Sequence, residues 1–234
     1  MDIDVKLQLL AELQDEYRDC QRCGLCAPKG RQRKHVVFGD GNPNARLMII
    51  GEAPGAEEDR TGIPFHPGAP AGGLLEKFLR SFNSSREEVY ITNAVMCRPT
   101  LDDDPDRNRP PTTEEIEACS ARLHRMIEII DPHVLLILGD KAMKALKAFT
   151  KKKVTQIAGD RMLPRATVRT NGASVVVERP AIVTFHPSYL LRSDSMEEGG
   201  DMHMAYLAWQ KAIGIADTYN QLYYGITPPN REVE

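Results

Sequence analysis

The stretch RLMIIGEAPGAEEDRTGIPF, from Arg46 to Phe65, joins a short apolar run to a segment rich in glycine, proline and charged residues. Its first part belongs to an apolar run, residues 45–51, that ends in glycine as a buried parallel strand would. The polar part that follows, Gly51 to Phe65, has two interpretations. It is either an ordinary solvated loop or the wall of a binding site at the end of the strand.

Other apolar runs alternate with helical patterns along the chain. Strands are expected at residues 87–97, 133–139 and 181–191, and helices at 4–18, 72–82, 112–130, 140–149 and 199–214. Residues 165–180 have the pattern of a hairpin closed at Asn171-Gly172. The alternation predicts an α/β fold, a three-layer α/β/α sandwich around a four-stranded, mainly parallel sheet. We expect a single domain over residues 1–214 and a C-terminal tail over 215–234.

Polar residues gather where the expected strands end. In parallel α/β sheets, ligands bind beyond the carboxyl ends of the strands. The segment after Gly51, the residues from Asn93 to Cys97, Gly139 and His186 all lie at such ends. We therefore expect them to converge on one site, which favours the second interpretation of the opening segment.

Composition limits the class of protein. The 234 residues are 41% hydrophobic, which suits one soluble domain with a sizeable core, and no apolar run approaches the ~20 residues that span a bilayer. The N-terminus lacks a secretory signal pattern, so we expect a cytoplasmic protein without membrane contact. A net charge of −3 argues against a polybasic nucleic-acid wrapper. The basic runs 29–34 and 141–153 leave local DNA contact open, although either could be a solvated face.

Five cysteines are poor material for disulfides in a reducing cytosol, so their clustering suggests a metal or catalysis. Cys20 and Cys23 form a C-x2-C pair, which lets two thiolates bind one centre from a single turn. Cys97 and Cys119 could complete a tetrahedral set for zinc or an iron–sulfur cluster. Alternatively, these two are small core residues. The spacing alone does not choose the metal, and it gives Cys26 no partner.

Six blocks in order resemble family 4 uracil-DNA glycosylases, the iron–sulfur branch of the uracil-DNA glycosylase superfamily. They are GEAPGAEED, GIPF, YITNAVMCRP, NRPPTTEEIEAC, LLILGDKA and HPSYLLR. The resemblance implies an enzyme, a hydrolase acting on N-glycosyl bonds, that removes uracil from DNA in base excision repair and leaves an abasic site. It implies a monomer whose partner is single- or double-stranded DNA containing uracil. It also assigns a structural [4Fe–4S] cluster to Cys20, Cys23, Cys97 and Cys119 and leaves Cys26 as a spare.

The resemblance also gives roles to residues that would hold the flipped base. Phe65 would be the stacking platform, in place of its alternative as a core phenylalanine. The amide of Asn93 would read the O4 and N3–H edge of uracil, which cytosine presents in reverse. His186 would donate a hydrogen bond to uracil O2 as negative charge builds on the leaving group.

Other matching positions would act on the sugar, the base edge and the phosphates. Glu52 corresponds to the acid that positions water or stabilises the sugar cation. Glu58 lies where the family walls off the C5 side of the base and so rejects thymine. Backbone N–H groups around Ala53, and Ser188 near the histidine turn, would bind phosphates, and Arg192 is a further phosphate contact.

Two segments depart from the family pattern. Residues 66–73, HPGAPAGG, replace a shorter VGRAG-like segment next to Phe65. The loop after Cys97 carries an acidic stretch at residues 101–106. Two alternatives therefore stay open beside uracil removal: a glycosylase for another modified or damaged base, and a non-catalytic iron–sulfur DNA-binding module. The joint presence of Glu52, Asn93 and His186 argues against the second alternative, because a protein that only binds needs none of them.

Overall fold

The computed structural model describes residues 1–26, 35–102, 104, 106–146, 153–158, 161–162, 165–170, 173–193 and 197–224. Within these ranges, the side chains of residues 161–178 and 219–224 are left out of the description. None of the helices in the described part of the chain is long and apolar enough to cross a membrane.

The core of the fold is a six-stranded sheet in the order β1-β3-β2-β4-β8-β5. Its four central strands are parallel, as predicted: β3 (Tyr90–Asn93), β2 (Leu47–Gly51), β4 (Val134–Leu138) and β8 (Ala181–Thr184). Two short strands, β1 (Asp40–Gly41) and β5 (Arg161–Met162), add antiparallel edges that the sequence pattern did not reveal. The predicted α/β fold is confirmed, with two more strands than expected.

The expected hairpin forms a separate two-stranded sheet. Its strands are β6 (Arg165–Thr170) and β7 (Ala173–Glu178), and they pair antiparallel. The expected turn at Asn171-Gly172 lies outside the described residues.

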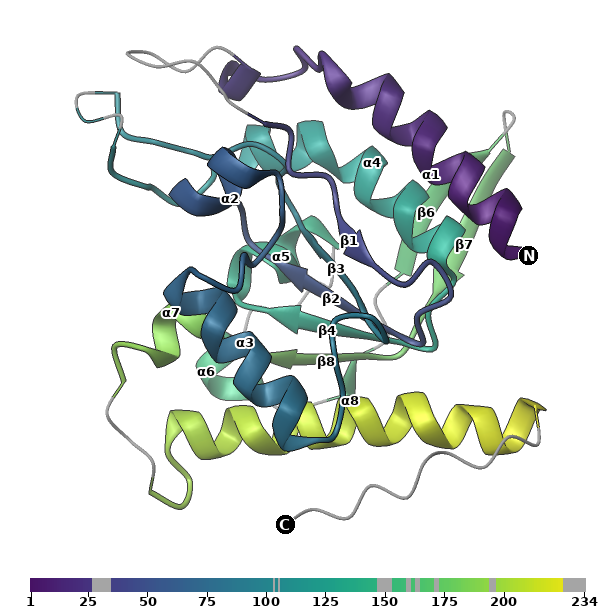
Figure 1. The fold of residues 1–234 in the computed structure, drawn as a ribbon, viewed down its shortest axis with the longest axis vertical. Coiled ribbons are helices and arrows are strands. Elements are labelled where there is room, and N and C mark those ends of the chain that lie inside the picture. The colour runs from purple at the N-terminus through teal and green to yellow at the C-terminus, as the bar shows by residue number, and fades with distance from the viewer. Residues whose placement is uncertain are drawn as a thin grey trace.

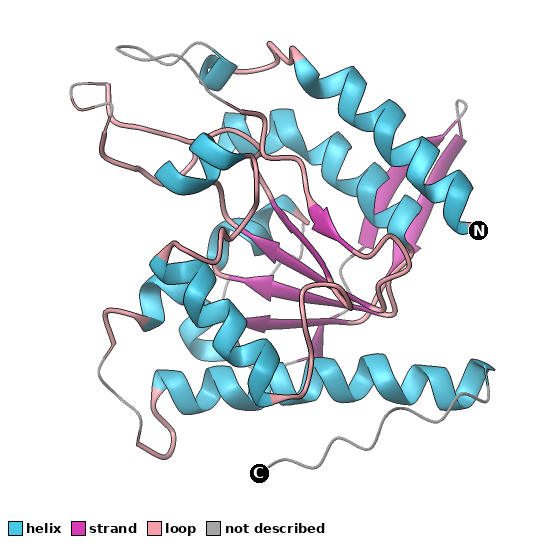
Figure 2. Ribbon diagram, viewed as in Figure 1, coloured by secondary structure: helices cyan, strands magenta, loops and turns pink. Residues whose placement is uncertain are grey.

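Helices lie on both sides of the central sheet (Figures 1 and 2). Figure 1 shows α1 (Ile3–Arg18) and α4 (Thr113–Ile130) on one side, and α3 (Pro70–Ser81) and α8 (Asp201–Tyr224) on the other. Helix α3 packs on α8 through Phe78 and Trp209, whose rings stack 5.1 Å apart between centroids. Strands β2 and β4 are buried at every position, because both faces of the sheet are covered.

Local turn and helix chemistry explains where the structure differs from the sequence-based elements. The segment after Gly51 contains a short helix, α2 (Ala56–Thr61), rather than loop alone. The last segment, residues 181–191, was expected to be a strand that runs into a His-Pro turn; the strand ends at Thr184, and Pro187 at that turn begins helix α7 (Pro187–Leu190). Two further short elements were unexpected: η1 (Gly24–Cys26) and α6 (Val154–Ile157). The helix expected at residues 140–149 is present as α5 (Asp140–Ala145), and residues 147–149 of that range lie outside the described residues. Helix α8 continues past Gly214, into the residues expected to form a tail.

Candidate active site

A pocket of about 800 Å³ opens at the carboxyl edge of the parallel strands. It is lined by all eight residues to which the sequence analysis gave catalytic or base- and phosphate-binding roles, namely Glu52, Ala53, Glu58, Phe65, Asn93, His186, Ser188 and Arg192. These residues come from segments far apart in the sequence, and the parallel register of β2, β3 and β8 brings them together. The segment after Gly51 is therefore part of a pocket wall and not only a surface loop.

Gly51 allows the two sides of the pocket to meet. A Cβ atom on Gly51 would lie 2.4 Å from Asn93 Oδ1 and 2.5 Å from two carbons of the Phe65 ring. Contacts this short are excluded for a real side chain, so only glycine fits here. Strand β2 therefore ends in a residue without a side chain, and the Asn93 amide and the Phe65 ring lie against the backbone of Gly51.

Phe65 is held in an uncommon backbone conformation. Its φ of 47° is in the left-handed region, which is unfavourable for a bulky residue. Arg86 stabilises this turn, because its guanidinium donates to the carbonyl of Phe65 at 3.1 Å and to that of Pro64 at 2.8 Å. Arg86 is itself held by Glu76 and Asp40, each at 3.2 Å. The ring is therefore fixed in the pocket, 5.5 Å from the His186 ring between centroids.

Within the described part of the chain, two buried polar atoms in this pocket have no hydrogen-bond partner: Asn93 Oδ1 and His186 Nε2. Asn93 is buried at the end of β3. Buried polar atoms are nearly always satisfied, so an orphaned pair in one pocket indicates that a ligand completes them. A ligand that matches both must offer a donor to the amide oxygen and an acceptor or donor to the imidazole nitrogen.

The protonation state of His186 follows from its contacts. His186 is the N-cap of α7, and its Nδ1 accepts a hydrogen bond from the backbone N–H of Ser188 at 3.2 Å. Nδ1 therefore carries no proton, and the proton of the neutral ring is on Nε2. Burial, with Arg192 nearby, lowers the pKa of His186 to about 4, so the ring is neutral at pH 7. The buried Nε2 is thus a neutral donor.

Two acidic residues, Glu52 and Glu58, line the pocket and make different contacts. Burial raises the pKa of Glu52, while Lys141 lowers it in part and Asp140 raises it. The backbone of Glu52 is anchored beside the end of β3, because its carbonyl accepts from the N–H of Val95 at 3.1 Å. The Glu58 carboxylate, in contrast, accepts from the N–H of Gly55 at 3.1 Å and so begins helix α2.

The predicted phosphate contacts lie at the pocket but are not equivalent. The N–H of Ser188 is engaged by His186, so only its hydroxyl is left for a ligand. Arg192 is exposed. Further pocket residues were given no role by the sequence analysis, namely Asn108, Arg109, Lys141 and Tyr189. Asn108 and Arg109 belong to the block NRPP, whose place in an ordered motif was the only available signal.

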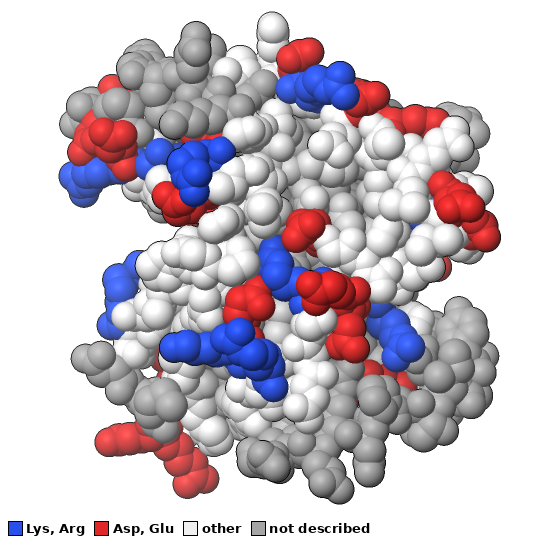
Figure 3. All heavy atoms as spheres, viewed as in Figure 1, with Lys and Arg blue, Asp and Glu red and all other residues white. Residues whose placement is uncertain are grey.

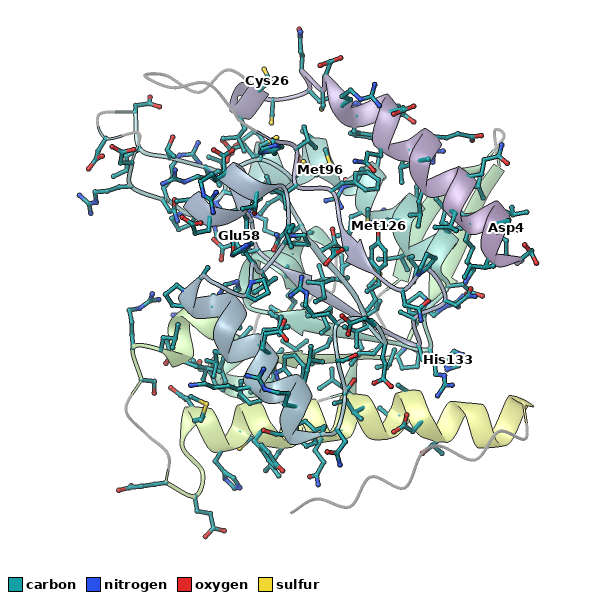
Figure 4. All side chains as sticks on the ribbon, in the orientation of Figure 1. Asp4, Cys26, Glu58, Met96, Met126 and His133 are labelled. Atoms are coloured by element: carbon teal, nitrogen blue, oxygen red, sulfur yellow. The ribbon has the colours of Figure 1, made fainter. Side chains whose placement is uncertain are left out.

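We call the four cysteines of the predicted cluster the thiol corner (Cys20, Cys23, Cys97 and Cys119): Cys23 lies near Cys119 and Cys20, and Cys119 and Cys97 both lie near Arg122. Cys97 and Cys119 are buried, and the other two are half-buried against the same core. Burial raises the pKa of Cys23, and the nearby Cys119 and Cys20 thiols add to this effect. Cys26, at the end of η1, is half-buried and is labelled in Figure 4.

Within the described residues, no three His, Cys, Asp or Glu side chains are arranged as a formed metal site. The donor set nevertheless fits an iron–sulfur centre in kind, because it supplies four cysteine thiols, none of them in a disulfide, from a C-x2-C turn, a strand end and a helix.

The chain is an α/β protein whose pocket, with an aromatic ring, an amide and a neutral imidazole at the carboxyl edge of a parallel sheet, suits a flat, polar ligand. The family model described as the Uracil DNA glycosylase superfamily matches residues 38–210. The chain belongs to this superfamily.

Relatives within the superfamily are similar over most of the chain. The type-4 uracil-DNA glycosylase of Thermotoga maritima is 38% identical over 190 residues, which cover 81% of this chain and 87% of that protein. The type-4 enzyme of Saccharolobus solfataricus is 46% identical over 126 residues, 53% of each chain. The type-5 uracil-DNA glycosylase of Pyrobaculum aerophilum is 33% identical over 143 residues, 52% of this chain and 60% of that protein. The predicted resemblance to family 4 is confirmed.

Proposed function

We propose that this protein is a uracil-DNA glycosylase, which hydrolyses the bond between uracil and deoxyribose and leaves an abasic site. The observation that carries the proposal is the pair of orphaned atoms, Asn93 Oδ1 and His186 Nε2, in one pocket beside the Phe65 ring. Uracil supplies the matching groups: a flat ring, an N3–H donor and carbonyl acceptors. Type-4 relatives with this name support the same activity.

The base must first leave the helical stack, at a cost of a few kcal/mol. In the pocket, the Phe65 ring stacks on the extruded base. Asn93 Oδ1 accepts from uracil N3–H, and the amide NH2 group donates to O4. Cytosine presents a bare N3 and an amino group instead, so it would place acceptor against acceptor and donor against donor. The fixed amide thus selects uracil over cytosine.

Bond cleavage leaves negative charge on uracil and positive charge on the sugar. A neutral Nε2–H donor on His186 stabilises the anion at O2 without first giving up a proton. Glu52, as a carboxylate, orients a water molecule toward C1′ or stabilises the cationic sugar. Lys141 favours this charged form, because it lowers the pKa of Glu52 against the effect of burial.

The wall beside Glu58 is proposed to reject thymine. Glu58 is 7% exposed and its carboxylate accepts from the N–H of Gly55, so the wall cannot easily move. A methyl group at C5 would have to displace this hydrogen-bonded turn.

DNA is the partner, and the phosphates are proposed to contact the mouth of the pocket. Figure 3 shows Lys and Arg side chains interspersed with Asp and Glu over the described part of one face. We therefore propose that the DNA phosphates bind at a few local contacts and not over a broad basic patch. These contacts would be the backbone N–H groups near Ala53, the Ser188 hydroxyl and Arg192. Cytoplasmic location and a monomeric state remain predictions, and light scattering during size-exclusion chromatography tests the latter.

The thiol corner is proposed to hold a [4Fe–4S] cluster through Cys20, Cys23, Cys97 and Cys119. Its contribution would be structural: it would fix the segments that lead into the pocket. Base release, as described above, uses only the side chains of the pocket.

A gel assay tests the proposed activity. Oligonucleotides carry one uracil, thymine or cytosine, in single strands and in duplexes, and are treated with alkali after incubation with excess enzyme. We expect strand breaks at uracil only. Cleavage at another modified base but not at uracil would favour the alternative glycosylase. DNA binding without any cleavage, by protein with its expected iron content, would favour the non-catalytic module.

A further inference from the structure

Arg122 of helix α4 is fully buried, at 0% exposure, beside the thiol corner. It lies one helical turn after Cys119, so both side chains are on the same face of the helix. Burying a guanidinium without an anionic partner costs several kcal/mol, and buried charges are normally paired. Among the described residues, no carboxylate forms an ion pair with Arg122 in the structure.

The contacts of Arg122 connect the corner to the base pocket. Its Nη2 donates to the backbone carbonyls of Asn93 at 2.7 Å and Ala94 at 3.2 Å. Its Nη1 donates to Thr92 Oγ1 at 3.0 Å and approaches Met126 Sδ at 3.8 Å. Figure 4 labels Met126 and Met96 in this interior region between α4 and the sheet. The guanidinium therefore holds the backbone from which the Asn93 amide extends.

One donor of Arg122 is left over. Its Nε is buried and has no hydrogen-bond partner among the residues that the structure describes. Burial lowers the pKa of Arg122, while Cys119, Tyr90, Tyr17 and Cys97 act in the opposite direction, which places two thiols of the corner among its nearest ionisable groups. Among the described residues, Arg122 therefore has no negatively charged partner, and its Nε–H donor is unused. Both features indicate an anionic sulfur centre beside Arg122.

We propose that Arg122 is the internal counter-charge of the sulfur-ligated centre in the thiol corner and a positioning residue that couples this centre to Asn93. Four thiolates around a cluster carry net negative charge, which would balance the guanidinium, and a cluster sulfur would accept from Nε–H. The inference rests on the proposed cluster. Arg122 touches neither substrate nor reacting atoms, so its effect on cleavage would pass through the Asn93 backbone.

Three variants separate this role from simple packing. Arg122→Met keeps an extended side chain but removes the charge and all donors, whereas Arg122→Lys keeps the charge. Arg125→Met is the matched control, because Arg125 is on the same helix but half-exposed and pairs with Glu16. All proteins are purified without oxygen, and their iron and sulfide contents, iron loss to a chelator, midpoint potential and single-turnover cleavage are measured.

We expect Arg122→Met to lose iron on the order of tenfold faster than wild type. Its midpoint potential should be lower, because a positive charge stabilises the more negative reduced centre, and its cleavage rate should fall. Arg122→Lys should restore much of the iron retention and potential, and Arg125→Met should match wild type. Equal iron loss, potential and cleavage rate in Arg122→Met and Arg125→Met would overturn the inference, even with the cluster present. Iron-free wild type would instead overturn the proposed cluster.

A measurement on wild type covers the case in which Arg122→Met does not fold. The Nε–H proton of Arg122, identified by its loss in Arg122→Lys, should be shifted or broadened by the paramagnetic centre in the iron-loaded protein. A signal that is identical in iron-loaded and iron-depleted protein would contradict contact between Arg122 and the centre.

Discussion

The backbone N–H of Ser188 donates to Nδ1 of His186 at 3.2 Å. This bond begins helix α7, so the turn that ends the last parallel strand also fixes the tautomer of the histidine. A ring that accepts through Nδ1 must carry its proton on Nε2, the buried atom in the pocket that has no partner. The histidine is therefore prepared as a neutral donor before any substrate arrives.

Removing this donor tests its role in catalysis. His186→Ala should lower single-turnover cleavage of uracil by roughly 10²–10³-fold, the usual loss for one oxyanion-type donor. Binding of uracil-containing DNA should change little, because the bond strengthens only as negative charge develops. The control is His66→Ala: Nδ1 of His66 also accepts an N–H two residues on, from Gly68 at 3.1 Å, but His66 is not part of the pocket lining. A wild-type rate for His186→Ala would refute the role.

The pH dependence should distinguish His186 from Glu52. The pKa of His186 is lowered from 6.5 to about 4, so its stabilising contribution is present above pH 6.5 and is lost as the pH falls toward 4. Denaturant unfolding of wild type and His186→Ala over this range measures the loss. The cleavage rate should show no histidine step near 6.5. Because burial raises the pKa of Glu52 above 4.5, any acid limb above 4.5 should belong to Glu52 and disappear in Glu52→Gln. A fall in the cleavage rate near pH 6.5 that depends on His186 would contradict the lowered pKa of this histidine.

Base selection should depend on the Asn93 amide. Asn93→Asp replaces the NH2 donor with an oxygen that repels uracil O4, and we expect uracil cleavage to fall roughly 10–100-fold, as for one lost bidentate base contact. Single-turnover rates on uracil, measured beside DNA binding, check this. Equal rates for Asn93→Asp and wild type would show that the amide does not read the base.

The glycine at the end of β2 should be indispensable for packing. Gly51→Ala would press a methyl group against the Asn93 amide and the Phe65 ring, and such overpacking typically costs ~1–3 kcal/mol of stability. Cleavage should be lost as well, because both pocket groups must move. Gly214→Ala is the control: Gly214 lies within helix α8 with no atom within 4 Å of its added Cβ, so this variant should fold and cleave as wild type. Thermal unfolding and single-turnover cleavage compare the two.

Replacing different cysteines by serine should have different effects on iron content and solubility. Cys97→Ser and Cys119→Ser should lose iron and solubility, while Cys26→Ser, at the half-buried end of η1, should keep both. Iron analysis and visible absorbance after anaerobic purification test this, with about four irons per chain expected for wild type. Zinc in place of iron in wild type would contradict the cluster assignment.

The sequence allowed the layers of the fold to be predicted because hydrophobic periodicity reports burial directly. Residues 47–51 are apolar because β2 is covered on both faces. The helix expected at 112–130 is capped by Thr112 and begins at Thr113, because a capping box between Thr112 and Glu115 marks its start. The short strands β1 and β5 have two residues each, too few for any period to appear. Helix α2 was missed because glycine and charged residues are equally typical of loops.

The sequence predicted residues that line the pocket, but not their protonation or hydrogen-bonding states. Ordered motifs indicated Asn93 and His186, yet no motif reveals which imidazole nitrogen carries the proton or that the amide oxygen is unpaired. These properties arise from tertiary contacts, such as the N–H of Ser188. Arg122 shows the same limit: in sequence it is one basic residue in an amphipathic helix, and only the fold makes it a buried charge.

Nitrogen NMR of the His186 ring tests the central claim most directly. In wild type at pH 7, long-range ¹H–¹⁵N spectra, assigned with His186→Ala, should show an unprotonated Nδ1 and a protonated Nε2. Addition of free uracil should shift the Nε2 signal and leave the ring neutral. A cationic ring, a proton on Nδ1, or an Nε2 signal that does not respond to uracil would contradict a pocket built around a neutral histidine donor.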